Sequence, residues 1–148
     1  MRGYSAVCLT NPKTSMNVGS AMRAAGCFGS SVVFTTGDRY KSGKTDTFKA
    51  YRHIPLVRYH GEGISDIIPY DCVPIAVDLV EGATPLHEYK HPQRAIYVFG
   101  AEDETLNGDI LDSCKDRVYI PTKGCLNLAA CVNVVLYSRM AYFMKETL

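Results

Sequence analysis

The sequence predicts a single α/β domain in which helices flank a mostly parallel sheet. Apolar and β-branched residues form a strand-like run from Tyr4 to Leu9, a helical pattern extends from Val18 to Phe28, and a second β-branched run covers Ser31 to Thr36. Strand, helix and strand in this order form a parallel unit with a right-handed crossover. The 148 residues suffice for one core and leave little for a second, so we expect one domain over residues 1–148.

Local signals delimit the first strand and the first helix. Pro12 lacks the backbone donor that a strand needs, so the strand should end near Asn11. Asn17 is placed to cap the first turn of the helix, and Gly29 is placed to end its last turn. Between them, small and apolar residues recur at helical spacing.

The rest of the chain continues the α/β pattern. Turn residues separate four further apolar segments that predict strands, namely Leu56 to Tyr59, Val73 to Val80, Ala95 to Phe99 and Arg117 to Ile120. A short helix is predicted near Leu106 to Cys114. A long final helix is predicted from Leu126 to Lys145, where apolar residues recur every three or four positions. Asn127 and Asn133 interrupt its apolar pattern, and a helix cap accounts for only one of them.

Composition and charge exclude several classes of protein. Hydrophobic residues make up 47% and charged residues 21% of the chain, which is typical of globular proteins and not of disordered ones. The apolar runs are shorter than a membrane span and no signal peptide is evident, so we expect a cytoplasmic protein without membrane contact. The six cysteines lie singly, without CxxC or zinc-ligand spacing, which predicts reduced thiols and no metal site. A net charge of +1 leaves any nucleic-acid affinity to local clusters.

Three short motifs carry the chemistry. Neither GxGxxG nor GxxxxGK[ST] occurs in the chain, so a dinucleotide site of the Rossmann type and a P-loop are not supported. In chain order the motifs are Asn17 with Arg23 six residues later, Phe99-Gly100-Ala101-Glu102, and Ile120-Pro121 followed by Gly124-Cys125-Leu126-Asn127. The first could border a ligand cleft at the carboxyl end of its strand. Taken singly, each motif also suits a purely structural role, as a capped helix, a turn and a rigid loop.

In combination and in this order, the motifs resemble the SpoU/TrmH branch of the SPOUT RNA methyltransferases, and the resemblance covers nearly the whole chain. That family has an asparagine and an arginine six residues apart, then Phe/Leu-Gly-x-Glu, then Ile-Pro, glycine and Ser-Leu-Asn before the last helix. Two positions depart from the pattern. Cys125 replaces the usual serine, and Thr105 precedes Leu106 where Gly-Leu is common.

The resemblance implies a fold, a cofactor and a reaction. The fold is a SPOUT-type sheet with a deep trefoil knot in its C-terminal half and no appended RNA-binding domain. The reaction is methyl transfer from S-adenosylmethionine to a ribose 2′-hydroxyl of an RNA, with tRNA favoured, in a homodimer that packs through the last helix. The residues implied in cofactor binding are Leu79, Gly100, Ile120, Cys125 and Leu126.

The resemblance also implies four catalytic residues, which are Asn17, Arg23, Glu102 and Asn127. A guanidinium has a pKa above roughly 12, so we expect Arg23 to orient the acceptor and stabilise charge before it acts as a base. Asn17, Glu102 and Asn127 would hold Arg23, the loops and the target nucleotide. Glu102 could instead bridge loops at a subunit contact.

The basic, tyrosine-bearing segment from Arg39 to Arg58 is the candidate for RNA contact, because cations suit phosphates and aromatic rings suit unpaired bases. A solvated loop is the alternative.

Other functions stay open at this point. Cys125 would suit an RNA-binding protein that keeps the knotted fold without catalysis. Base methylation and an unrelated α/β enzyme of small metabolites are further alternatives. Binding of S-adenosylmethionine separates the last of these from the others.

Overall fold

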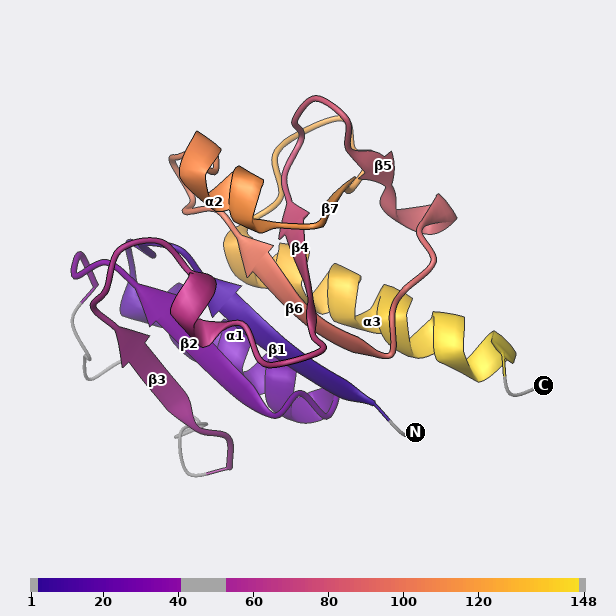
Figure 1. Ribbon diagram of the computed structural model, residues 1–148, viewed down its shortest axis with the longest axis horizontal. Coiled ribbons are helices and arrows are strands. Elements are labelled where there is room, and N and C mark those ends of the chain that lie inside the picture. Colours follow the sequence, from indigo (N-terminus) through magenta and orange to yellow (C-terminus); the bar gives the residue numbers. More distant parts are fainter. Residues whose placement is uncertain (1–2, 41–52, 147–148) are drawn as a thin grey trace.

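The sheet is entirely parallel among the strands that the structure describes. A computed structural model describes residues 3–40 and 53–146, and it contains a seven-stranded sheet in the order β3-β2-β1-β6-β4-β7-β5 (Figure 1). Every strand pairing is parallel. The strands are β1 (Tyr4–Leu9), β2 (Val32–Thr36), β3 (Leu56–Tyr59), β4 (Val73–Val77), β5 (Thr84–Pro85), β6 (Arg94–Phe99) and β7 (Asp116–Tyr119). The predicted fold class is therefore confirmed, whereas the trefoil knot stays a prediction.

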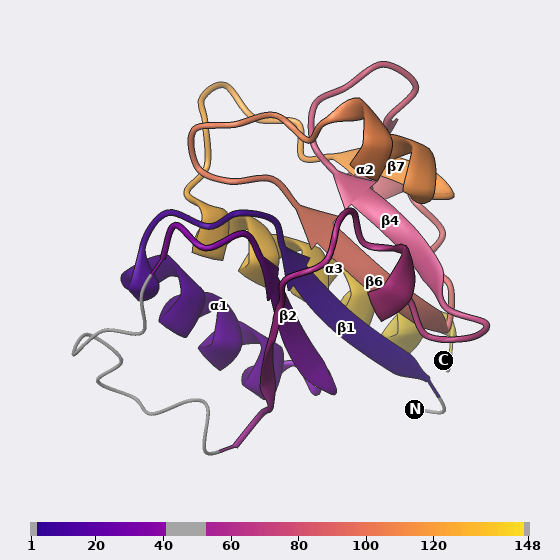
Figure 2. The same ribbon diagram turned by 60° about the vertical axis from the view of Figure 1, so that its left-hand side comes forward.

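Helices cover both faces of the sheet. Helices α1 (Ser15–Cys27) and α3 (Leu128–Glu146) lie side by side on one face (Figure 2). The short α2 (Gly108–Ser113) and the 3₁₀ turn η2 (Ser65–Ile67) lie on the other. Strand β1 alternates between these layers, because Val7 and Leu9 pack toward the long helices whereas Ala6 and Cys8 pack toward the opposite layer. Both faces of the central strands are buried, so these strands are largely apolar.

The predicted strands and helices are found, whereas the short β5 was not predicted. Side-chain hydrogen bonds account for some of the ends that differ from the prediction. The first and third predicted strands have the observed bounds of β1 and β3. Strand β4 ends at Val77, three residues before the predicted end. There the Asp78 carboxylate accepts hydrogen bonds from the backbone N–H groups of Leu79 (2.8 Å) and Leu106 (2.9 Å), which turns the chain out of the sheet.

The predicted cap of α1 is wrong. The helix begins at Ser15, and the Thr14 hydroxyl accepts a hydrogen bond from the Asn17 N–H at 3.3 Å. Asn17 lies inside the first turn, so its side chain is available for other contacts. Gly29 follows the helix with φ of 75°, as a glycine after a helix C-cap commonly does.

Helix α3 begins at Leu128 and not at the predicted Leu126. Asn127 precedes it and caps it, because the Asn127 Oδ1 accepts from the N–H groups of Ala129 (2.8 Å) and Ala130 (3.3 Å). Asn133 is exposed and donates back to the Ala129 carbonyl, so its polarity needs no buried partner.

A buried polar network fixes the second half of α3 to the amino ends of the strands. Arg139 is only 4% exposed and donates to the carbonyls of Pro92 and Gln93, each at 2.6 Å. His91 lies between the Tyr97 hydroxyl (2.7 Å) and the Ser138 hydroxyl (3.0 Å). This anchor leaves the opposite, carboxyl ends of the strands to form the site. No helix in the described ranges is both long enough and apolar enough to cross a membrane.

Candidate active site

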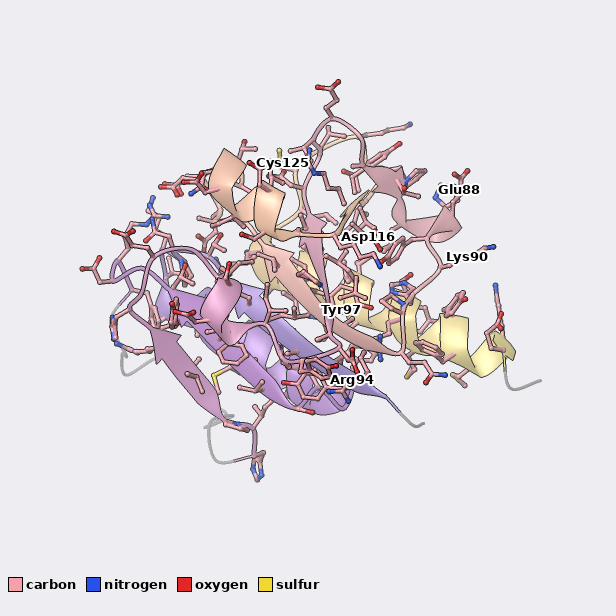
Figure 3. The ribbon with its side chains drawn as sticks, viewed as in Figure 1. Glu88, Lys90, Arg94, Tyr97, Asp116 and Cys125 are labelled. Atoms are coloured by element: carbon pink, nitrogen blue, oxygen red, sulfur yellow. The ribbon has the colours of Figure 1, made fainter. Side chains whose placement is uncertain are left out.

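A cleft of about 490 Å³ opens at the carboxyl ends of β4, β6 and β7, beside the start of α3. All five residues that the sequence suggested for cofactor binding line it, namely Leu79, Gly100, Ile120, Cys125 and Leu126. Figure 3 shows Cys125 at this end of the sheet, with Arg94 at the opposite end of β6. The side chains of Leu79 and Leu126 are 77% and 40% exposed. Exposed leucines at a cleft offer apolar area that a bound ring system would bury.

Three of the four predicted catalytic residues form one chain of hydrogen bonds, the motif network. The Asn17 Nδ2 donates to the Glu102 Oε1 at 2.7 Å, and the Asn127 Nδ2 donates to the Asn17 Oδ1 at 3.0 Å. The second carboxylate oxygen, the Glu102 Oε2, accepts from the Lys13 N–H at 3.1 Å. Residues separated by 85 and 110 positions in the chain are thus joined at the cleft that Glu102 lines.

The fourth predicted catalytic residue, Arg23, does not line the cleft of its own chain. It lies on α1 with an exposed side chain. Six residues turn a helix by about 240°, so Asn17 and Arg23 project from different sides of α1. The expectation that both border one cleft does not hold within a single chain. The catalytic role of Arg23 stays a prediction.

A second set of contacts, the loop clamp, was not predicted. The Arg39 guanidinium donates to the Asn11 carbonyl (2.8 Å from Nη2) and to the Asp103 carboxylate (2.9 Å). The hydrogen bond to Asp103 raises the pKa of Arg39 and lowers the pKa of Asp103. The clamp ties the loop after β1, which leads into α1 and Asn17, to the loop after β6, which carries Glu102. No signal in the sequence pointed to this contact, because the spacing of Arg39 and Asp103 along the chain does not indicate that they are neighbours.

The predicted RNA-contact segment lies largely outside the described residues, since 41–52 are not described. At its two ends the side chains have partners within the chain. Arg39 belongs to the loop clamp, and the Arg58 guanidinium lies 4.4 Å from the centroid of the Tyr40 ring. The role of the segment in binding RNA stays a prediction.

Two thiols line the cleft, Cys125 from the loop before α3 and Cys131 from the first turn of α3. Cys125 is exposed, whereas Cys131 is half-buried, and burial raises the pKa of the Cys131 thiol. The Thr122 hydroxyl donates to the Gly124 carbonyl at 2.6 Å and tightens the turn before Cys125. In the described part of the chain, no group of three or more His, Cys, Asp or Glu side chains is arranged to hold a metal ion.

A family model described as the SpoU rRNA Methylase family matches residues 5–137. The chain belongs to this family. The match includes all three motifs, the cleft and the motif network. The methyl donor of SpoU methylases is S-adenosylmethionine. Sequence comparison with curated proteins finds no match.

Solved structures share the SpoU fold. AviRb from Streptomyces viridochromogenes, a SpoU methyltransferase, is 19% identical with a TM-score of 0.85, and the match covers 98% of this chain and 62% of AviRb. AviRb has also been solved with the cofactor AdoMet. A protein studied for the 2-OH methylation of C/U34 on tRNA is 19% identical with a TM-score of 0.83, over 97% of this chain and 98% of that one. The TrmH/SpoU tRNA modifying enzyme of A. aeolicus is 15% identical with a TM-score of 0.84, over 99% and 78%. This chain thus spans less than two thirds of AviRb and nearly all of the second protein.

The cleft has the chemistry that S-adenosylmethionine needs. Its volume falls in the range of about 300–1,000 Å³ that is usual for small-molecule sites. Apolar side chains line part of the cleft, and Asp78, Glu102 and Glu104 add carboxylates that suit a ligand with a sulfonium and an ammonium group. The residues present therefore fit the cofactor of the family.

Proposed function

We propose that this chain methylates a ribose 2′-hydroxyl of RNA and that its substrate is a tRNA. The motif network carries the proposal, because it places two amides and a carboxylate beside a cleft suited to the methyl donor. A relative that matches over 98% of its own length was studied for 2-OH methylation on tRNA, which supports the same acceptor here.

Different residues would bind the methyl donor and position the methyl acceptor. Leu79, Ile120 and Leu126 would bury the adenosine part of S-adenosylmethionine, and the main chain at Gly100 would approach it closely. Cys125 lies at the same wall. When bound, S-adenosylmethionine supplies an electrophilic methyl group.

The motif network would hold the acceptor side in position. Both carboxylate oxygens of Glu102 accept hydrogen bonds from the chain itself, so we assign Glu102 to holding Asn17 and the loop at Lys13. Positioning of the acceptor oxygen supplies much of the acceleration in a transfer of this kind. The 2′-hydroxyl proton must also leave, and Arg23 would stabilise the charge that develops on the oxygen.

Arg23 would reach the acceptor of a second chain. It is exposed on α1, the helix that packs beside α3, and it does not line the cleft of its own chain. A homodimer that packs through α3 would bring α1 near a second subunit. We therefore propose a homodimer whose sites are completed across the interface.

The first experiment measures binding and transfer separately. Purified protein is titrated with S-adenosylmethionine by calorimetry, then incubated with the radiolabelled donor and size-fractionated RNA, and the RNA is digested to nucleosides. We expect label in a 2′-O-methylnucleoside of the tRNA fraction. Cofactor binding without label in any RNA fraction would favour a binding protein without catalysis, and label on a base would contradict the ribose assignment.

Substitution of Arg23 tests the acceptor side. We expect Arg23→Ala to lower kcat by at least about a hundredfold, in the range of a lost charge-stabilising group, with the affinity for S-adenosylmethionine nearly unchanged. The matched control is Arg94→Ala, which removes an arginine at the far end of β6 (Figure 3). Equal loss of donor affinity and transfer in Arg23→Ala would contradict the assignment.

A further inference from the structure

A second cavity of about 270 Å³ lies next to the cofactor cleft, at the carboxyl ends of β1 and β2. The two cavities share Ala101 and Glu104 as a common wall. The other residues that line the second cavity come from four loops and α2, and they are Thr10, Asn11, Thr36, Gly37, Gly61, Gly63, Thr105, Leu106, Asn107, Asp109 and Ile110. None of the site residues predicted from the sequence is among them.

The backbone that encloses this cavity adopts unusual conformations. Asn11 has φ of 47° and Gly37 has φ of 73°, and both lie in the left-handed region. A Cβ atom at Gly37 would lie only 2.3 Å from the Asn11 Oδ1, so only glycine fits there. The loop clamp holds the same turn, because Arg39 binds the Asn11 carbonyl. Such backbone conformations persist where the surroundings impose them, and they cluster at functional sites.

The described residues that line the cavity carry hydrogen-bonding groups and no cationic side chain. Asp109 and Glu104 supply carboxylates. Glu104 also has partners within the chain, because its Oε1 lies 3.7 Å from the Arg39 Nη1 and its Oε2 accepts a long hydrogen bond from the Asn11 Nδ2 at 3.4 Å. Asp109 is therefore the main acceptor that the cavity offers to a ligand. Asn107 uses its Oδ1 to cap α2 through the Ile110 N–H at 2.9 Å, and its Nδ2 has no hydrogen-bond partner among the described residues. This set offers acceptors for amino groups and one amide donor for a carbonyl. The negative charge of the two carboxylates disfavours a phosphate at this wall.

We propose that the second cavity binds a nucleobase of the RNA substrate that carries an exocyclic amino group. Carboxylates accept hydrogen bonds from such amino groups, as in contacts of Asp or Glu with cytosine N4. The volume is just below the usual range for whole small-molecule ligands, which suits a single base whose ribose and phosphate stay outside. The proposal rests on the proposed function, because the shared wall at Glu104 would put the base next to the methyl donor.

Nuclear magnetic resonance of the whole ¹⁵N-labelled protein tests this proposal, because glycines line both cavities. Gly37, Gly61 and Gly63 report on the second cavity, whereas Gly100 and Gly124 report on the cofactor cleft. The protein is first saturated with S-adenosylhomocysteine and then titrated with CMP, AMP or UMP. We expect CMP and AMP to shift the amides of the second cavity with dissociation constants on the order of 1 mM, and UMP to bind more weakly.

Two substitutions on α2 localise the effect. Asp109→Asn keeps the shape of the side chain and removes its charge, and we expect it to weaken CMP binding at least about tenfold, in the range of one charged hydrogen bond. Asp112→Asn is the matched control, because Asp112 is exposed on the same helix and lines neither cavity. Its CMP affinity should equal that of the unchanged protein.

The outcomes separate this proposal from the proposed function. Shifts at Gly100 and Gly124 with S-adenosylhomocysteine, but none at Gly37, Gly61 and Gly63 with any nucleotide, would overturn the base site alone. Equal binding of UMP and CMP would overturn the requirement for an amino group. No response of Gly100 and Gly124 to S-adenosylhomocysteine would contradict the proposed function whatever the nucleotides do.

Discussion

At the scale of single residues, the site depends on side chains that use each polar atom for a different partner. Asn127 caps α3 with its oxygen and binds Asn17 with its nitrogen. Asn17 accepts from Asn127 and donates to Glu102, whose two oxygens face different donors. Each amide orientation is therefore fixed by its neighbours, and a change of a single atom should propagate through the network.

Exchange of one oxygen of Glu102 for an amide tests this coupling. In Glu102→Gln one carboxylate oxygen becomes an NH₂ group, which meets a donor at either Asn17 or Lys13. We expect kcat to fall at least about tenfold while the protein stays folded, because the network loses a hydrogen bond to a charged group, which is worth roughly 1.5–3 kcal/mol. Steady-state kinetics and thermal unfolding measure the two effects. An unchanged kcat would mean that Glu102 does not position the acceptor side.

Restoration of the serine usual in the family tests the one departure inside the cleft. Cys125 is exposed at the cleft wall, and a hydroxyl is a stronger hydrogen-bond donor than a thiol. We expect Cys125→Ser to raise transfer by a few fold if this position contacts the substrate, with little change in stability at an exposed site. The measurement is kcat/KM on the methylated RNA fraction, and a lower value would show that the thiol itself is favoured here.

Sequence reasoning located the residues of the site better than their contacts. The motifs pointed to Asn17, Glu102 and Asn127, which the structure brings together. The loop clamp of Arg39 and Asp103 was not predicted from the sequence. These residues follow different strands, and they become neighbours only because β1 lies between β2 and β6 in the sheet. The second cavity was not predicted for the same reason.

At the scale of elements, α3 connects the site to the core. Its first turn is capped by a residue of the motif network, and its second half is anchored by Arg139. The apolar spacing predicted the helix, but Arg139 was not expected on its buried face. That position is polar because the helix crosses the amino ends of β1 and β6, where the Tyr4 and Gln93 carbonyls need donors.

Two substitutions of Asn127 separate its two tasks. Asn127→Ala removes the cap and the contact with Asn17, and we expect a loss of about 1 kcal/mol of stability together with a loss of transfer. Asn127→Ser keeps a capping oxygen but has no amide to donate to Asn17, so it should retain most of the stability and still lose transfer. Urea unfolding and transfer assays on both variants test this. Parallel loss of stability and activity in both would mean that Asn127 acts only as a cap.

At the scale of the whole molecule, a neutral histidine ties stability to pH. His91 is 4% exposed and contacts the rings of Tyr89, Tyr97 and Tyr142, and Ser138 binds its second nitrogen. Burial, and then the nearby Arg139 cation, lower the pKa of His91 from 6.5 to about 4. The unfolded chain thus takes up this proton at a higher pH than the folded one.

We therefore expect stability to fall as the pH decreases from 6.5 to about 4. One pKa unit corresponds to about 1.4 kcal/mol, so the loss is on the order of 3 kcal/mol. Urea unfolding across this range measures it, and His91→Gln should flatten the dependence. If that variant does not fold, NMR titration of His91 in the unchanged protein serves instead. A His91 pKa near 6.5 would contradict the expectation.

The order of the strands also has a consequence for how the chain folds. Strand β1 is central, and its second neighbour β6 begins about ninety positions later in the chain. The helix that packs beside α1 is α3, which is made still later. Contacts so distant in sequence must close large loops, which slows folding. During synthesis on a ribosome, β1 would therefore lack its neighbour β6, and α1 would lack its neighbour α3, until these later elements have emerged. Chaperones that bind exposed apolar segments would have their main opportunity in that interval.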